Sequence, residues 1–388
     1  MHLHRDSTDS DASAGSFDFH GVEHEIDYFD EPDDESSSNL STKLGREISK
    51  DAVAVLISKY GNSSATAWLE FERYHLWQAD EGQVPESSFP PVQGYMARKK
   101  WVFAWGNPLV SDKAALPSTA RAFTAWVRSQ NLTPVWCCID APLEHAMGEL
   151  GWSTVDCIYE DVLHAKHVLQ MTSNENKGKE GQHVVKDLKK NLRRAEKAGL
   201  TIQEVTGKWT DKMRDDVNSG IERWKKHRVG PQIASTTFVA FTDEPHRRYW
   251  LAFHNNNIVG ILILTPTGPS SYLIKNCASF PDAPRGTSEA LIHRGLEVID
   301  KEGTARGCEI PVSFGITASD GVKPVSNLSG WKIMSLSKVY HSVSMGAGLF
   351  KRADFRSKFD SEHQPMYVAY TDGFGVDTIR SLLKVLKK

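Results

Sequence analysis

Residues 183–199 read HVVKDLKKNLRRAEKAG, and this stretch says most about the chain. Apolar residues recur in it at helical spacing and predict one apolar stripe of an amphipathic helix: Val184, Val185, Leu188, Leu192 and Ala195. Gly199 is well placed as the left-handed residue that ends the helix. Six cations lie outside the stripe: Lys186, Lys189, Lys190, Arg193, Arg194 and Lys197. Such a face suits a nucleic-acid backbone, and a merely solvated surface is the alternative.

Composition separates an acidic N-terminus from a basic remainder. Of the 388 residues, the first forty carry twelve acidic side chains and one basic one, Arg5. Few apolar residues accompany them, so we predict a disordered acidic tail over residues 1–44. Because the whole chain has a net charge of -3, the rest is net basic and could approach nucleic acid or an anionic membrane.

Targeting and cysteine patterns narrow the class further. No apolar stretch is long enough to span a bilayer, and the N-terminus lacks the apolar core of a signal peptide. The five cysteines show no CxxC spacing, which disfavours a disulfide framework or a zinc site. We therefore expect a cytoplasmic protein without a bound metal, in contact with membranes only at their surface.

The order of predicted elements repeats once along the chain. Helix, hairpin strands, helix, strand, helix and strand occur in each half, which predicts an α/β (α+β) fold of two related units. The predicted domains are residues 45–170 and 201–388, joined by a linker and the basic helix at 171–200. The predicted helices are 48–60, 120–130, 144–150, 209–226 and 288–302, and Gly303 is predicted to end the last of them. The predicted strands are 68–69, 74–77, 94–98, 101–108, 134–139, 248–253, 258–264, 271–275, 312–316 and 368–370. Residues 368–370 are predicted to end the sheet.

Several segments carry a resemblance to a known family. Residues 189–199 are similar to its "RR-x-x-x-RAEKAG" helix, 279–292 (SFPDAPRGTSEALI) to "SPDAPxGxxDxLx", and 355–367 (FRSKFDSEHQPMY) to "FKxKFxPxWxPRY". Residues 313–318 stand where the family has "NLGMAP", and the segment around 104–108 also matches. The chain resembles the aminoacyl-tRNA-dependent transferase domain of bacterial phosphatidylglycerol lysyl- and alanyltransferases over roughly residues 45–375. It is closer still to the freestanding fungal ergosteryl-3β-O-glycine synthases.

The resemblance implies a fold and a reaction. The fold is two tandem acetyltransferase-like (GNAT) domains joined by the basic helix. The reaction is transfer of an amino acid from aminoacyl-tRNA, glycyl-tRNA in the freestanding fungal members, to a lipid hydroxyl, with no cofactor. The implied tRNA contacts are the six helix cations and Arg356.

The chemistry of transfer assigns further candidates. The ester is already activated, so the enzyme must position it, help remove one proton and stabilise an oxyanion. Glu289 is the candidate proton acceptor or amino-group anchor, or else a helix-start carboxylate stabilised by the dipole. Lys275 and Lys358 complete the predicted catalytic set; the alternatives are an edge-strand lysine in solvent for Lys275 and a solvated surface for Lys358 and Arg356. Trp224, Tyr272 and Phe314 are predicted to line the acceptor pocket, and the favoured alternative for Trp224 is an ordinary core residue.

Departures from the family pattern bear on the acceptor. Where bacterial members have Asp-Leu-Met-Arg, residues 272–275 read YLIK, so the acid is absent and Arg has become Lys. These changes favour a neutral sterol, the 3β-hydroxyl of ergosterol, over phosphatidylglycerol. A phosphatidylglycerol or other lipid aminoacyltransferase and a non-catalytic acetyltransferase-like RNA-binding protein remain as alternatives. An acetyl-CoA acyltransferase is disfavoured, because residues 283–287 lack the full pyrophosphate loop.

Overall fold

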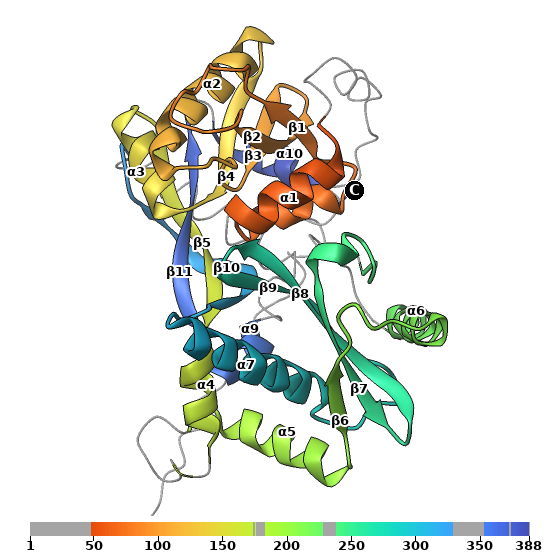
Figure 1. Ribbon diagram of the computed structural model, residues 1–388. Coiled ribbons are helices and arrows are strands. Elements are labelled where there is room, and N and C mark those ends of the chain that lie inside the picture. The colour runs from red at the N-terminus through yellow and green to blue at the C-terminus, as the bar shows by residue number, and fades with distance from the viewer. Residues whose placement is uncertain are drawn as a thin grey trace, which may run out of the picture.

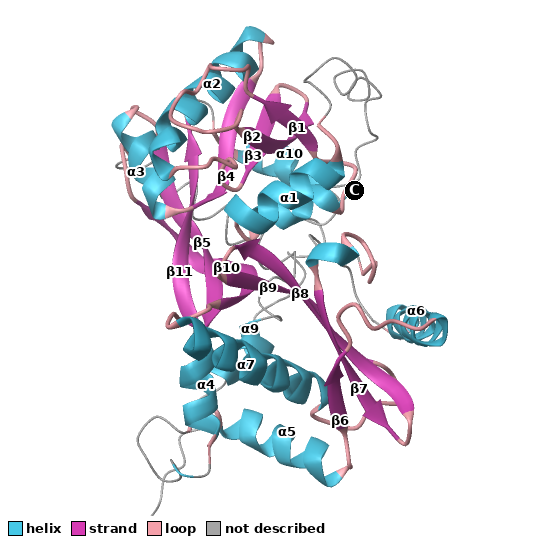
Figure 2. Cartoon of the chain, viewed as in Figure 1, coloured by secondary structure: helices cyan, strands magenta, loops and turns pink. Residues whose placement is uncertain are grey.

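The computed structural model describes residues 48–173, 175, 183–227, 238–328, 353–371 and 374–387, so the predicted acidic tail lies outside them. Their strands form one continuous sheet that runs through the whole molecule (Figures 1 and 2). Its order is β1 (His75–Gln78), β2 (Val92–Arg98), β3 (Trp101–Trp105), β4 (Thr133–Ile139), β11 (Glu362–Tyr370), β5 (Ser153–Leu163), β10 (Val312–Pro324), β9 (Ser271–Ser279), β8 (Asn257–Gly268), β7 (Arg248–His254) and β6 (Thr201–Glu204).

Helices cover both faces of this sheet, and each face has its own hydrophobic core in each half. In the N-terminal half, α2 (Leu116–Ser129) and α3 (Ala141–Glu149) cover one face. The other face holds α1 (Lys50–Tyr60), the 3-10 helix η4 (Ser64–Leu69) and α10 (Val376–Lys387). In the C-terminal half, α4 (Ala165–Thr172), α5 (Lys186–Lys197) and α7 (Thr287–Arg306) lie opposite α6 (Asp211–Lys226). The predicted α/β class is confirmed.

The last strand of the chain lies in the middle of the sheet. β11 pairs antiparallel with β4 on one side and with β5 on the other (Figure 1). The prediction that residues 368–370 end the sheet was therefore wrong, because strand order follows backbone pairing and not chain order. The domain boundaries expected at residues 45–170 and 201–388 stay a prediction.

Three local predictions also fail for identifiable reasons. Residues 68–69 belong to η4 and not to a strand, and Trp68 packs in the core from that turn. α7 passes through Gly303 and ends at Gly307, whose φ of 69° is the left-handed stop. Strand β5 was missed, because Asp156, Glu160 and Asp161 interrupt its apolar pattern.

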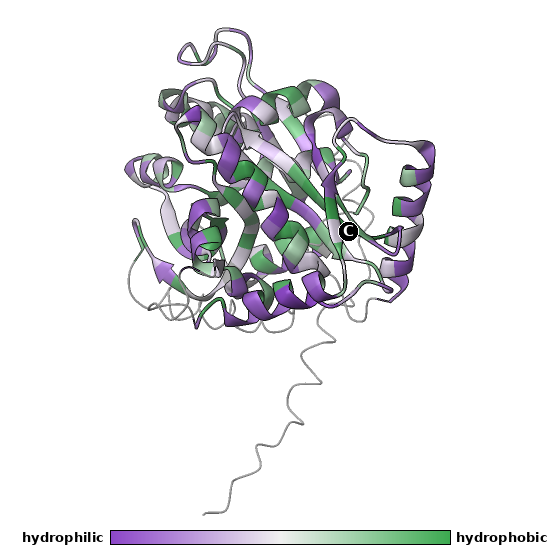
Figure 3. Cartoon of the chain, turned by 60° about the horizontal axis from the view of Figure 1, so that its bottom comes forward, coloured by the Kyte–Doolittle hydropathy of each residue, from purple (hydrophilic) through white to green (hydrophobic). Residues whose placement is uncertain are grey.

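The basic helix forms as predicted. Val185, Leu188 and Ala195 are buried, while Val184 remains exposed at the N-terminal end. Gly199 has a φ of 71°, and the amide of Leu200 donates to the carbonyl of Ala195 at 3.2 Å, which completes a Schellman ending. Five of the six cations are exposed; Lys189 is half-buried and donates to the Ser173 carbonyl at 3.3 Å. Hydrophilic residues accordingly mark the outward faces of the helices at this end (Figure 3).

A buried charge network connects the two halves. Glu70, which follows η4, lies 3.1 Å from Arg247 Nη2 and 3.2 Å from Lys275 Nζ on β9. All three side chains are about 1% exposed. Lys275 also donates to Thr66 Oγ1 at 3.2 Å. Burial lowers the pKa of Lys275, and the Glu70 carboxylate opposes that shift. The N-terminal half thus supplies the anion that two buried cations of the C-terminal half require.

Replacing Glu70 by Gln should strongly destabilise the fold. Removing one partner from a buried ion pair leaves uncompensated charge and typically costs about 3–5 kcal/mol. We expect urea unfolding of Glu70→Gln to give a free energy lower by about 3 kcal/mol or more. Glu72→Gln, the same substitution at a nearby exposed residue, should stay within about 0.5 kcal/mol of the wild type. Equal unfolding free energies for the two variants would contradict the role given to the network.

A second electrostatic contact joins α4 to the strands beside it. His164 Nδ1 lies 2.9 Å from Glu309 and its Nε2 lies 2.7 Å from Glu362. The bond to Glu362, with that to Glu309, raises the pKa of His164 despite partial burial. The imidazolium therefore bridges the approach to β10 and the start of β11.

This bridge predicts a pH dependence of stability. Because the folded pKa is raised above the ordinary value of about 6.5, the contribution is fully present below that pH and disappears as pH rises through the folded pKa. Urea unfolding of wild type and His164→Gln should therefore differ most in mild acid and converge as the pH rises. His145→Gln, which removes an exposed helix-surface pair, should show no such trend. A constant gap between wild type and His164→Gln from pH 5 to 9 would refute the assignment.

Candidate functional site

Glu289 occupies the first turn of α7 with its carboxylate almost buried. Its side chain is 8% exposed, and Oε1 accepts from Asn191 Nδ2 at 2.8 Å and from Lys358 Nζ at 3.0 Å. Both donors reach Oε1, so Oε2 has no partner among the described residues. The helix N-terminus adds a favourable potential for the negative charge. One carboxylate oxygen is thus fixed by Asn191 and Lys358, and the other makes no hydrogen bond to the described residues.

The loop before α7 sets the distance between that helix and α5. Gly286 has a φ of 94°, and a Cβ at this position would collide with the carbonyl oxygen of Asn191. Only glycine fits both the left-handed backbone and the close approach. Asn191 is a candidate site residue that the sequence pattern did not identify. The sequence feature that could have identified Asn191 is a polar side chain between Leu188 and Ala195, on the face of α5 that packs against α7.

Lys358 and Arg356 come from one short segment, α9 (Ala353–Arg356) followed by the 3-10 helix η9 (Ser357–Phe359). Lys358 reaches Glu289 as described, in agreement with its predicted place in the site. Arg356 instead points into the protein. Its guanidinium lies 2.8 Å from Asp161, contacts Thr317, and donates to the Phe314 carbonyl at 2.8 Å. The expected phosphate contact of Arg356 does not fit, because these internal acceptors already occupy its donors.

Lys275 is likewise separate from Glu289. Its Nζ is bound by Glu70 and Thr66, and its side chain is 1% exposed. The expected pairing of Lys275 and Glu289 in one transfer site is therefore not found. The β8–β9 register shifts beside Lys275, whereas Ile274 belongs to the core under α7. Because successive strand residues point to opposite faces of the sheet, Lys275 points toward η4 while Ile274 faces α7.

The three aromatic residues predicted for an acceptor pocket do not share one. Trp224 lies on α6 and packs edge-on against Phe238 at 5.3 Å. Phe314 and Tyr272 belong to the core on the opposite face of the sheet, under α7. Phe314 is 9% exposed, 5.4 Å from the ring of Phe359. Trp224 therefore cannot join Tyr272 and Phe314 in one pocket, because side chains on the two faces of a sheet cannot meet.

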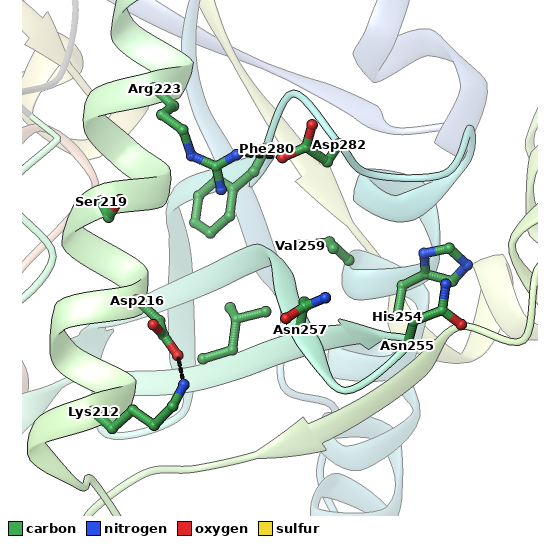
Figure 4. A pocket seen from close by; sticks show the side chains of 11 residues that line it. Lys212, Asp216, Ser219, Arg223, His254, Asn255, Asn257, Val259, Phe280 and Asp282 are labelled. Carbon is green, nitrogen blue, oxygen red and sulfur yellow. Dashed lines mark hydrogen bonds and ion pairs between the residues drawn. The ribbon is translucent and has the colours of Figure 1, made fainter.

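A polar groove of about 400 Å³ lies on the α6 side of the sheet (Figure 4). The α6 residues Lys212, Asp216 and Arg223 form one wall, and the β7–β8 turn with His254 forms the other. Lys212 pairs with Asp216 at 2.6 Å, and Arg223 pairs with Asp282. Glu289, Lys275 and Lys358 are absent from its lining.

Cysteine chemistry does not belong to the site around Glu289. Cys277 donates to the Ser288 carbonyl at 3.6 Å, next to Glu289 in sequence. Burial raises the pKa of its thiol to about 12, so it stays protonated near neutral pH and is a poor nucleophile. Among the described residues, no cluster of His, Cys, Asp and Glu side chains has the geometry to hold a metal ion.

Comparison with known proteins identifies the family. The family model of the phosphatidylglycerol lysyltransferase C-terminal domain matches residues 93–370. The chain belongs to this family. It is an enzyme of the aminoacyl-tRNA-dependent lipid aminoacyltransferase class, as the resemblance implied. A search of curated proteins returns no match.

Solved structures support the tandem acetyltransferase-like fold. The C-terminal domain of a putative lysylphosphatidylglycerol synthetase from Agrobacterium fabrum is 16% identical, with a TM-score of 0.64, over 87% of this chain and 96% of that one. L-PGS from Bacillus licheniformis is 13% identical, with a TM-score of 0.66, over 89% and 100%. A Bacteroides thetaiotaomicron protein of unknown function is 8% identical, with a TM-score of 0.53, over 84% and 99%. The predicted fold is confirmed.

The described part of the chain also bears on membrane contact. None of its helices combines the length and the apolar character that crossing a bilayer requires.

Proposed function

We propose that this family member transfers an amino acid from aminoacyl-tRNA, with glycyl-tRNA as the donor, to the 3β-hydroxyl of ergosterol. The observation that carries the choice of a neutral acceptor is the pairing of the basic residues predicted at the site. Lys358 lies 3.0 Å from Glu289, Arg356 lies 2.8 Å from Asp161, and Lys275 lies 3.2 Å from Glu70. Each cation already faces a carboxylate, so none of the three has free charge for a phosphate headgroup.

A phosphatidylglycerol acceptor is the second candidate, favoured by the description of the matching family. The two acceptors differ in charge and are separated by one assay. Purified protein is incubated with radiolabelled glycyl-tRNA and phosphatidylcholine vesicles that contain either ergosterol or phosphatidylglycerol, and the lipid extract is resolved. We expect label in the sterol ester. Label only in phosphatidylglycerol would replace the sterol proposal, and tRNA binding without any labelled lipid would favour the non-catalytic RNA-binding alternative.

In this proposal α5 binds the tRNA. Its exposed cations lie beside the segment that carries Lys358, because α5 packs against both α7 and η9. A phosphate backbone along α5 would bring the aminoacyl end toward Glu289. Glu289 Oε2 then either holds the α-ammonium group of the amino acid or accepts the proton of the acceptor hydroxyl.

Reversing two cations of α5 should weaken tRNA binding. Lys190→Glu with Arg194→Glu removes two exposed phosphate contacts, so affinity should fall and its slope against log salt should become shallower by about two units. The apolar stripe is untouched, so the fold should survive. The control is Arg121→Glu with Arg128→Glu, an equal charge change on the exposed face of α2. If both double variants bind tRNA alike across a salt series, α5 is only a solvated surface.

Neutralising Glu289 should abolish most transfer. Glu289→Gln keeps size and the ability to hydrogen-bond but removes the charge that either role needs. We expect single-turnover transfer from preloaded tRNA to fall by at least about a hundredfold, with tRNA affinity nearly unchanged. Glu297→Gln, the same substitution farther along α7, should transfer normally. A wild-type rate for Glu289→Gln would reduce this residue to a helix-start carboxylate.

A further inference from the structure

A second buried carboxylate lies on β5, near the segment that carries Lys358. Asp161 is 1% exposed, and its Oδ2 accepts from Arg356 at 2.8 Å and from Thr317 Oγ1 at 2.9 Å. Its Oδ1 lies 2.8 Å from Nδ1 of His363 and accepts from Ser361 Oγ at 3.4 Å. His363 stands directly opposite Asp161 in the β5–β11 ladder. Partners from β10, β11 and α9 thus fix the carboxylate completely.

This arrangement sets the tautomer of His363. A carboxylate at Nδ1 keeps the proton on that nitrogen, so a neutral imidazole presents Nε2 as an unprotonated acceptor. The ring of Tyr159 lies 4.2 Å from the imidazole and limits its rotation. The side chain of His363 is 58% exposed, and Nε2 has no partner among the described residues. The imidazole is therefore held at one edge and open to a substrate at the other.

The same short segment holds this pair and the Glu289 site. Arg356 contacts Asp161, and Lys358, two residues later, contacts Glu289. Phe355 and Phe359 fix the segment by packing against Phe314 at 6.3 and 5.4 Å. Any displacement of α9 and η9 would disturb both carboxylates together. This segment therefore connects the Asp161–His363 pair with the site around Glu289.

Resting on the proposed lipid aminoacyl transfer, we propose that His363 is its general base and that Asp161 is the positioning residue. Nε2 takes the proton of the acceptor hydroxyl while that oxygen bonds to the ester carbonyl carbon. The bond from that carbon to the ribose oxygen then breaks, and the proton passes from Nε2 to the ribose oxygen. The products are the aminoacylated lipid and deacylated tRNA. Glu289 is then left to hold the α-ammonium group.

Charged groups lie on each of the elements packed against His363. Asp161 and Glu160 lie on β5, Arg356 lies on α9, and Glu362 precedes His363 on β11. Burial raises the pKa of Glu160, with Ser313 and Ser63 opposing that shift. Asp161 therefore provides the negative charge in direct contact with the imidazole, and Arg356 balances it from the other carboxylate oxygen.

The test compares two variants, His363→Gln and His167→Gln. Single-turnover transfer from preloaded glycyl-tRNA is measured with vesicles that contain ergosterol or phosphatidylglycerol, from pH 5.5 to 9. His167 is a matched exposed histidine, which pairs with Asp360 at 2.8 Å. For His363→Gln we expect a fall of about a hundredfold to ten-thousandfold, loss of the acidic limb of the rate profile and unchanged tRNA affinity. His167→Gln should behave as wild type. Imidazole added to His363→Gly should restore part of the rate.

Asp161→Asn tests positioning by a separate readout. Without the carboxylate the Nδ1 proton of His363 is no longer held, so Asp161→Asn should lower the transfer rate with KM nearly unchanged, and Asp161→Glu should restore part of that rate. A wild-type rate for Asp161→Asn would remove Asp161 from the proposal. Full transfer by His363→Gln at every pH overturns the base assignment and leaves the proposed function standing. Failure of the wild-type chain to label either lipid overturns the proposed function and the base together.

Discussion

The structure depends on the backbone pairing of β11 between β4 and β5 (Figure 1). Without this strand the sheet would divide at its centre, because β4 and β5 have no direct pairing in the observed order. β11 also fixes the segment before it. η9 ends three residues before β11 begins, so the position of Lys358 follows from the register of β11 with β5. One pairing therefore joins the two halves and delivers a lysine to the site around Glu289.

Three buried carboxylates follow one pattern: each pairs with a basic side chain from a distant part of the chain. Glu70 pairs with Arg247 and Lys275, Asp161 pairs with Arg356, and Glu289 pairs with Lys358. Desolvation would make each of these groups costly alone. The outer face of α5, by contrast, carries five exposed cations that could face an external polyanion.

The sequence predicted features that depend on local pattern. The apolar stripe of α5, its end at Gly199 and the repeated α/β order required only periodicity and glycine conformation. Prediction from the sequence failed where a charged side chain pairs with a residue far away in the chain. A lysine on an apolar strand suggested catalysis, yet Lys275 is held by Glu70, more than two hundred residues earlier. Arg356 looked like a phosphate ligand within a basic run, but Asp161 from an unrecognised strand binds it. Partners so distant leave no periodic signal.

The same reasoning explains how two carboxylates can have different tasks. Glu289 stands at a helix N-terminus, with one oxygen held by Asn191 and Lys358 and the other without a described partner. Asp161 is 1% exposed, whereas the side chain of its partner His363 is 58% exposed. A partly open carboxylate can receive an ammonium group, whereas an enclosed one can act only through the side chain it orients. Because Arg356 and Lys358 are two residues apart, the chain holds both carboxylates from a single segment. An aminoacyl group anchored at one and a hydroxyl activated at the other would then be brought together by one rigid element.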